Sequence, residues 1–168
     1  MIQLPRSMGL AFQQIRELQL YKFEELRELP DTLSQLQHLI LLEVVEAPKL
    51  TSIPDGIGAL SRLIELDLSG CKALQQLPST LTQLSCLSIL TLEYTSISSL
   101  PPRFAQLTRL RTLKLSCCNQ LRALPDDLTE LKMLQHLDVK GCKQALDGIS
   151  RALRYGLRDM HGLKFMKY

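Results

Sequence analysis

The sequence lacks any apolar run near the length of about 18 residues that a membrane span requires, although 45% of its 168 residues are hydrophobic. Met1 is not followed by a basic and then an apolar segment, so no secretory signal is visible. The single asparagine, Asn119, makes no glycosylation sequon because Gln120 and Leu121 follow it. These absences favour a soluble protein that works in the cytoplasm.

The glycines and cysteines also lack the spacing of two common kinds of site, a phosphate-binding loop and a zinc site. The glycines are scattered, and Gly56-Ile57-Gly58 lacks the G-x-G-x-x-G continuation that cradles phosphate groups. The five cysteines include no C-x₂-C pair of the kind that binds zinc. We therefore expect neither a nucleotide cofactor nor a structural metal.

The sequence does contain a recurring pentad, Leu-x-x-Leu-Pro, in which isoleucine replaces a leucine in two copies. Successive copies are separated by 24, 24, 23 and 24 residues, and they span 26–30, 50–54, 74–78, 97–101 and 121–125. A fixed period of roughly 20 to 29 residues indicates units that bury their apolar faces only by stacking on one another. The whole chain, residues 1–168, is predicted to be one repeat domain.

Each repeat combines two apolar spacings. Leu66 and Leu68 are two apart, which is the period of a strand face. Ile57, Leu60 and Leu63 are three apart, which suits a short helical or 3₁₀ turn. The proline of each pentad can open such a turn but cannot lie inside a strand ladder. We expect the polar residue after it to cap the turn through its side chain. Four repeats have such a residue: Asp31, Asp55, Ser79 and Asp126.

These motifs resemble the leucine-rich repeat family. The resemblance implies an α/β horseshoe with a parallel sheet of about six strands on its concave face and short helical or 3₁₀ turns on its convex face. Residues 1–25 then form a partial or divergent repeat, 26–144 form five full repeats, and 145–168 form a basic C-terminal cap.

Within that family, the segments 68–71 (Leu-Ser-Gly-Cys) and 139–142 (Val-Lys-Gly-Cys) narrow the resemblance. They are similar to the intracellular arrays of plant disease-resistance receptors and of bacterial type III effectors delivered into plant cells. In both groups the array selects a protein partner, and signalling or catalysis belongs to another domain. The resemblance implies a role in plant immunity, in the cytoplasm or in the host cytoplasm.

Three cysteines, Cys71, Cys118 and Cys142, lie three residues after the last apolar strand residue of their repeats. We expect a column of buried thiols there. A disulfide between Cys118 and Cys142 stays open, since neighbouring strands are about 4.8 Å apart and a disulfide joins Cα atoms about 4.4 to 6.8 Å apart. Zinc bound by Cys117, Cys118 and Cys142 is the weaker alternative.

The nearest approach to a catalytic set is Cys117 with His136 and Asp138. In the aligned repeats Cys117 lies five positions beyond His136, which is roughly 16 Å along a strand. These side chains cannot share a proton, so the chain is predicted not to be an enzyme. His38, on a turn, and His161, in the tail, are predicted to be solvated rather than catalytic.

Recognition of a partner is the remaining function, and it would use the strand residues that alternate with the buried leucines. An apolar patch is predicted at Ile40, Leu41, Val45, Ile64 and Ile89, with Tyr21 and Tyr94 at its margin. Acidic residues accumulate in the first part of this face, and basic residues in the last part. The complete predicted site is Tyr21, Ile40, Leu41, Glu43, Val45, Ile64, Glu65, Asp67, Ile89, Thr91, Glu93, Tyr94, Arg111, Lys114, His136 and Asp138.

The charge favours a protein or peptide partner over nucleic acid. The net charge is +3, but residues 1–139 carry −2 and the excess lies in residues 140–168, which carry +5. The basic tail is interpreted as the solvated face of the cap. The sequence therefore predicts a non-catalytic protein-interaction module that binds its partner on the concave face. The module is expected to be the recognition domain of a larger immune receptor or effector. The alternative is the substrate-recognition domain of a multidomain enzyme, such as an effector ubiquitin ligase whose catalytic part lies outside this chain.

Overall fold

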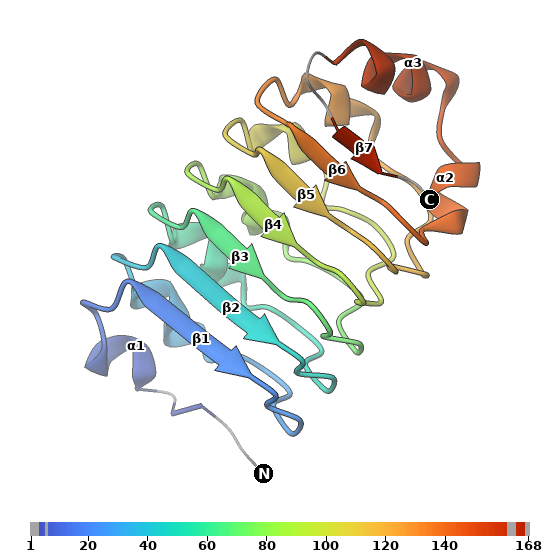
Figure 1. The fold of residues 1–168 in the computed structure, drawn as a ribbon. Coiled ribbons are helices and arrows are strands. Elements are labelled where there is room, and N and C mark those ends of the chain that lie inside the picture. Colours follow the sequence, from blue (N-terminus) through green and yellow to red (C-terminus); the bar gives the residue numbers. More distant parts are fainter. Residues whose placement is uncertain (1–3, 6, 161–163, 167–168) are drawn as a thin grey trace.

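The computed structural model describes residues 4–5, 7–160 and 164–166, so the prediction for His161 lies outside the described residues. Within the described part, one parallel sheet contains seven strands that follow one another in chain order (Figure 1). The strands are β1 (Glu17–Tyr21), β2 (Leu41–Val45), β3 (Glu65–Asp67), β4 (Ile89–Thr91), β5 (Thr112–Lys114), β6 (His136–Asp138) and β7 (Lys164–Met166). The α/β solenoid is confirmed, and the expected six strands are exceeded by β7.

Short 3₁₀ turns form a second layer behind the sheet (Figure 1). They are η1 (Asp31–Gln35), η2 (Asp55–Ala59), η3 (Ser79–Gln83), η4 (Phe104–Gln106) and η5 (Asp126–Glu130). Four of them begin directly after the pentad proline, which is extended, with φ between −68° and −64°. Pro102 changes the fourth repeat, where η4 instead follows Arg103 with a φ of 59°.

The expected side-chain capping of these turns is wrong. The proline itself occupies the N-cap position, and its carbonyl oxygen accepts from the backbone N–H three residues later, as in the 2.9 Å contact between Leu33 and Pro30. No side-chain cap hydrogen bond is present at η1, η2, η3 or η5. The residues Asp31, Asp55, Ser79 and Asp126 are each the first residue of a turn, one position too late to cap it.

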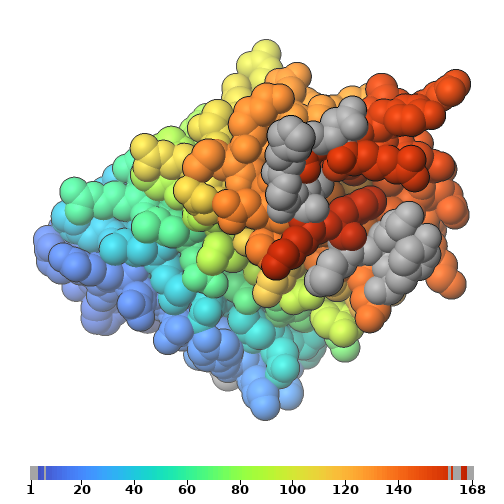
Figure 2. All heavy atoms as spheres, turned by 45° about the horizontal axis from the view of Figure 1, so that its top comes forward, coloured from blue at the N-terminus to red at the C-terminus, as the bar shows by residue number. Residues whose placement is uncertain are grey.

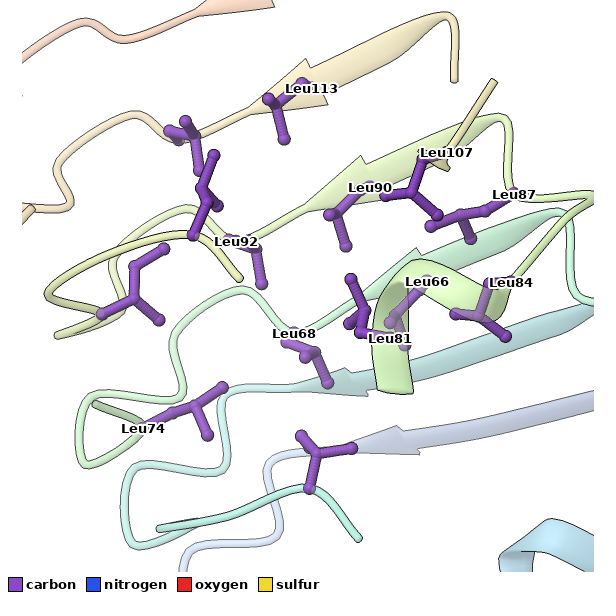
Figure 3. Packing of buried hydrophobic residues seen from close by; sticks show 14 of the residues in the cluster. Leu66, Leu68, Leu74, Leu81, Leu84, Leu87, Leu90, Leu92, Leu107 and Leu113 are labelled. Atoms are coloured by element: carbon purple, nitrogen blue, oxygen red, sulfur yellow. The ribbon is translucent and has the colours of Figure 1, made fainter. Parts of the chain in front are cut away.

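The core lies between the sheet and the turns and runs the length of the array. Leu66 and Leu90 on the strands lie near Leu81 of η3 and Leu84 directly after it (Figure 3), and all four side chains have no exposed surface. Phe104 of η4 is the largest fully buried side chain. Each repeat therefore buries its apolar side chains against its neighbours, as the 24-residue period predicts.

The turn after each strand uses a left-handed backbone at one fixed position of the repeat. Two glycines, Gly70 and Gly141, occupy this position. Glycine suits the Leu-Ser-Gly-Cys motif because it adopts a positive φ without strain, and because a Cβ at Gly70 would lie only 3.2 Å from the Cα of Glu46. The φ values in this column lie between 56° and 80°. Its members are Lys22, Glu46, Gly70, Tyr94, Cys117 and Gly141.

Helices lie at both ends of the array. α1 (Met8–Ala11) packs against η1, and α2 (Lys143–Asp147) and α3 (Arg151–Asp159) follow β6. Leu153 and Leu157 are four residues apart and so share one face of α3, and both are buried. β7 then pairs with β6 in parallel, and the red segments in Figure 2 lie over the end of the array.

Candidate interaction surface

The concave surface is the outward face of the sheet, and the strand pairing fixes which side chains stand beside one another. One row runs across neighbouring strands through Glu17, Leu41, Glu65, Ile89, Thr112 and His136. A second row runs through Gln19, Glu43, Asp67, Thr91, Lys114 and Asp138. Both rows are those predicted from the repeat spacing.

The predicted apolar patch spans β2 to β4. Ile64 is 43% exposed, and the marginal aromatic residues Tyr21 and Tyr94 are 50% and 58% exposed. The other four apolar members, Ile40, Leu41, Val45 and Ile89, are half-buried. The patch thus combines three exposed side chains with four half-buried ones, and exposed apolar and aromatic residues are frequent at protein interfaces.

Thr91 requires a correction, because its side chain is only 4% exposed. It occupies an outward strand position, but it stands between Asp67 and Lys114 on the neighbouring strands. Those longer side chains flank the short threonine side chain. Thr91 is therefore unavailable to a partner, whereas the remaining predicted residues are all exposed or half-buried.

Acidic side chains gather on β2 and β3. The Glu43 carboxylate accepts hydrogen bonds from the Tyr21 hydroxyl and, at 2.8 Å, from Gln19 Nε2. Asp67 Oδ1 accepts from the backbone N–H of Ser69 at 2.8 Å. Burial, followed by the charges of Glu43 and Asp67, raises the pKa of Glu65 above its ordinary value. This part of the surface is therefore electronegative.

The Tyr21–Glu43 contact leads to a test by titration. The hydrogen bond to Glu43 raises the pKa of Tyr21 to about 12, and Glu43→Gln is expected to return it toward the ordinary tyrosine value of about 10. Because the folded pKa is raised, the contact's stabilisation is complete below about pH 10 and is lost as the pH approaches 12. Tyrosinate absorbance measures the titration, and Tyr21→Phe assigns the signal. An unchanged Tyr21 titration in Glu43→Gln would contradict the contact.

Basic side chains occupy the other half of the surface. Arg111, Lys114 and His136 are exposed on or beside β5 and β6. Asp138 is half-buried, and its Oδ1 accepts from the backbone N–H of Lys140 at 2.9 Å. The predicted change from acidic residues in the first strands to basic residues in the last strands is thus found on side chains that solvent can reach.

The cysteine column is buried as predicted. Cys71, Cys118 and Cys142 are fully buried, and their thiols donate to the carbonyl oxygens of Val44 (3.2 Å), Leu92 (3.0 Å) and Leu115 (2.9 Å), respectively. All five cysteines are free thiols, so the Cys118–Cys142 disulfide is not formed. Burial raises the pKa of Cys71 to about 11. The column is structural because its sulfur atoms satisfy backbone carbonyl groups inside the solenoid.

Alkylation tests this placement. Iodoacetamide is expected to modify the half-buried thiols Cys86 and Cys117 in the folded protein and to leave Cys71, Cys118 and Cys142 unmodified. Peptide mass spectrometry reads the modified positions, and unfolding in guanidinium should expose all of them. Rapid modification of Cys71 in the folded state would place that thiol outside the core.

No arrangement for catalysis or metal binding emerges among the described residues. His136 pairs with Thr112, so Cys117 lies five positions further along β5 and its following turn. Within the same residues, no group of three potential ligand side chains could hold a metal ion. Nor does any helix there combine the length and apolarity that a membrane crossing requires.

A hollow of about 630 Å³ adjoins the patch where the chain enters the strands. Three of its lining residues, Ile40, Ile64 and Arg111, belong to the predicted site. Four others were not predicted from the sequence: Arg62, Cys86, Arg109 and Met133. The sequence signal that could have found them is a column of residues that lies two positions before Ile40, Ile64 and Arg111 in each repeat. That column contains His38, Arg62, Cys86, Arg109 and Met133.

Comparisons with known proteins agree with this fold. The family model for the leucine-rich repeat matches residues 62–84, which is one repeat. The leucine-rich repeat domain of the type III effector XopL is 24% identical over 99% of this chain, with a TM-score of 0.75. The Arabidopsis receptor kinase HAESA, solved with the peptide hormone IDA and the co-receptor SERK1, is 21% identical over 98% of the chain, with a TM-score of 0.71. A plant peptide hormone receptor, RGFR1, solved with RGF2, is 19% identical over 99% of the chain, with a TM-score of 0.57.

The repeat motif, the strand order and the structural likeness together show that this chain has the fold of a leucine-rich repeat solenoid. A search of curated protein sequences finds no match. The chain spans 65% of the XopL domain structure, 27% of the HAESA structure and 34% of the RGFR1 structure, which is less than two thirds of each.

Proposed function

We propose that this chain is a non-catalytic interaction module that binds a protein or peptide on its concave face. The observation that carries the proposal is the exposure of apolar and aromatic side chains along β1 to β4. Ile64, Tyr21 and Tyr94 are exposed, and Ile40, Leu41, Val45 and Ile89 are half-buried. Apolar and aromatic side chains at such positions add nothing to the core, and they are frequent anchors at protein interfaces. The structural likeness to HAESA and RGFR1, each solved with a peptide hormone, supports the same use of this fold.

The sheet has room for such a partner. Six strands, β1 to β6, at about 4.8 Å spacing, make an arc of roughly 24 Å, which suits a standard interface of about 800 Å² per partner. The acidic residues near β2 and β3 and the basic residues near β5 and β6 would orient the partner and favour one direction of docking. In this proposal the site comprises the predicted residues other than Thr91.

Affinity capture tests the proposal. The wild-type chain and the Leu41→Arg/Ile64→Glu variant are immobilised side by side and exposed to lysate, and mass spectrometry identifies the captured proteins. A partner that only the wild type retains is the expected result. Equal capture by both chains would move the site away from the patch.

The second candidate function is the recognition domain of a larger enzyme or receptor in plant immunity, located in the host cytoplasm. The likeness to a type III effector domain favours it, together with the Leu-Ser-Gly-Cys motif at 68–71. Under this candidate the isolated chain binds the substrate and transfers nothing to it. Ubiquitin transfer by residues 1–168 alone, in a reconstituted assay, would contradict both candidates.

A further inference from the structure

The hollow at the strand entry forms a groove that differs in character from the patch beside it. We call it the strand-entry groove, and define it by three arginines and three apolar residues: Arg62, Arg109, Arg111, Ile40, Ile64 and Met133. These residues precede β2 to β6, so the groove crosses the edge of the sheet where the turns lead into the strands. Ile40 and Ile64 join it to the apolar patch.

Among the residues that the structure describes, the three arginines form no ion pair with a carboxylate. Arg62 Nη1 lies 3.3 Å from His38 Nδ1, and Arg109 Nη1 lies 3.8 Å from the sulfur of Cys86. Among the described residues, the only ion pair joins Lys49 to Glu25, far from the groove in the repeat pattern. None of the described residues that line the groove is an aspartate or a glutamate. Its guanidinium groups therefore keep most of their donors free for an anionic partner.

The apolar residues decide what kind of anionic partner fits. Ile64 is 43% exposed and Met133 is 40% exposed, so the groove presents apolar side chains to solvent beside β3 and beside β6. The described lining of the groove contains no aromatic residue, whereas proteins that hold single-stranded nucleic acid stack its bases on aromatic side chains. A peptide with both acidic and aliphatic side chains satisfies the arginines and the apolar surface together.

We propose that the strand-entry groove binds an extended acidic segment of the protein partner, with carboxylates on Arg62, Arg109 and Arg111 and aliphatic side chains on Ile64 and Met133. The proposal rests on the proposed interaction function and names the chemistry of the partner. The groove crosses five repeats, from β2 to β6, which is about 19 Å at 4.8 Å per strand and matches about six extended residues. Arg62 and Arg109 are two strands apart, so they select carboxylates about 10 Å apart.

The test uses synthetic peptides on the complete chain. The probe is a fluorescein-labelled peptide, Glu-Leu-Glu-Asp-Leu-Glu flanked by glycines, and the control peptide has lysine at every acidic position. Fluorescence anisotropy gives the affinities for the wild type and for Arg62→Ser/Arg109→Ser. The matched control, Arg27→Ser/Arg122→Ser, removes the same charge from exposed positions outside the groove. Circular dichroism verifies that each variant is folded.

The acidic peptide is expected to bind at least about tenfold more tightly than the basic one, and more weakly as salt is raised. The groove variant should lose about tenfold or more of this affinity, and the control variant should keep it. Equal affinity for the two peptides, absence of binding, or equal loss in both variants would overturn the proposal. Tighter binding of single-stranded oligothymidylate through the same arginines would also overturn it, in favour of nucleic acid.

Capture of the natural partner separates failure of the groove from failure of the module. A partner that wild type retains, that Leu41→Arg/Ile64→Glu loses and that Arg62→Ser/Arg109→Ser keeps in full would overturn the groove and leave the interaction function standing. Loss of the partner in both variants, but not in Arg27→Ser/Arg122→Ser, supports the groove. If the wild-type chain captures no partner but binds the acidic peptide through the arginines, the proposed interaction function is contradicted and the peptide-binding groove is not.

Discussion

Leu66→Ala is expected to lower the free energy of unfolding by about 2–5 kcal/mol, because it leaves a cavity in the middle of the array. Leu66 lies on β3 with no exposed surface, and its side chain lies near those of Leu81 and Leu84 (Figure 3). A repeat in a solenoid is held by its two neighbours, so this cavity weakens the contacts of the second full repeat on both sides. Chemical denaturation followed by circular dichroism measures the loss.

Ile64→Ala is the matched control for that measurement. Ile64 lies two residues before Leu66 and is 43% exposed, so its truncation removes little buried surface. Its effect should be within about 0.5 kcal/mol, as for most surface substitutions. Comparable losses for Leu66→Ala and Ile64→Ala would contradict the assignment of one residue to the core and the other to the concave surface.

Leu41→Arg with Ile64→Glu is expected to weaken partner binding by at least about 100-fold while the fold persists. Two charges would be buried at the interface without partners, and two anchors worth about 1–2 kcal/mol each would be lost, with about 1.4 kcal/mol equal to a factor of ten. Leu41 is half-buried, but the arginine stem can lie along the sheet with its charge in water. Titration calorimetry with the captured partner measures the change.

A second pair of substitutions controls for the added charges. Ala59→Arg with Gln83→Glu places the same two side chains on η2 and η3, where both positions are exposed on the convex side. Its affinity for the partner should stay within about twofold of wild type, as expected for residues outside an interface. Unfolding of the concave variant, or an equal loss in the convex variant, would contradict the proposed site.

The sheet register was predictable because it follows from two regular features of the sequence. The 24-residue interval aligns Leu41 with Glu65, and the two-residue alternation then assigns every strand side chain to the core or to the concave face. Both features are local, so neither depends on contacts between distant parts of the chain. The buried thiol of Cys71 follows from the same alignment.

Other features depend on contacts with neighbouring side chains or segments, so they could not be predicted from the sequence. β7 lacks the pentad, and its pairing with β6 is a contact between segments that no repeat spacing relates. Thr91 has an outward position, but the size of the side chains beside it decides its exposure. Arg62 and Arg109 belong to the turns, and only the assembled edge brings them together with Met133. Asp31 fails to cap η1 because the proline takes the N-cap position.

Hydroxyl-radical footprinting of the complex with the captured partner tests the central claim most directly, because exposed side chains report on both surfaces of the same molecule. Tyr21, Ile64 and Tyr94 are exposed on or beside the concave face, whereas Phe12 follows α1 and Tyr155 lies on α3. We expect the partner to reduce oxidation of Tyr21, Ile64 and Tyr94 and to leave Phe12 and Tyr155 unchanged. Protection confined to Phe12 or Tyr155, with the concave side chains still fully oxidised, would contradict a concave-face interaction module.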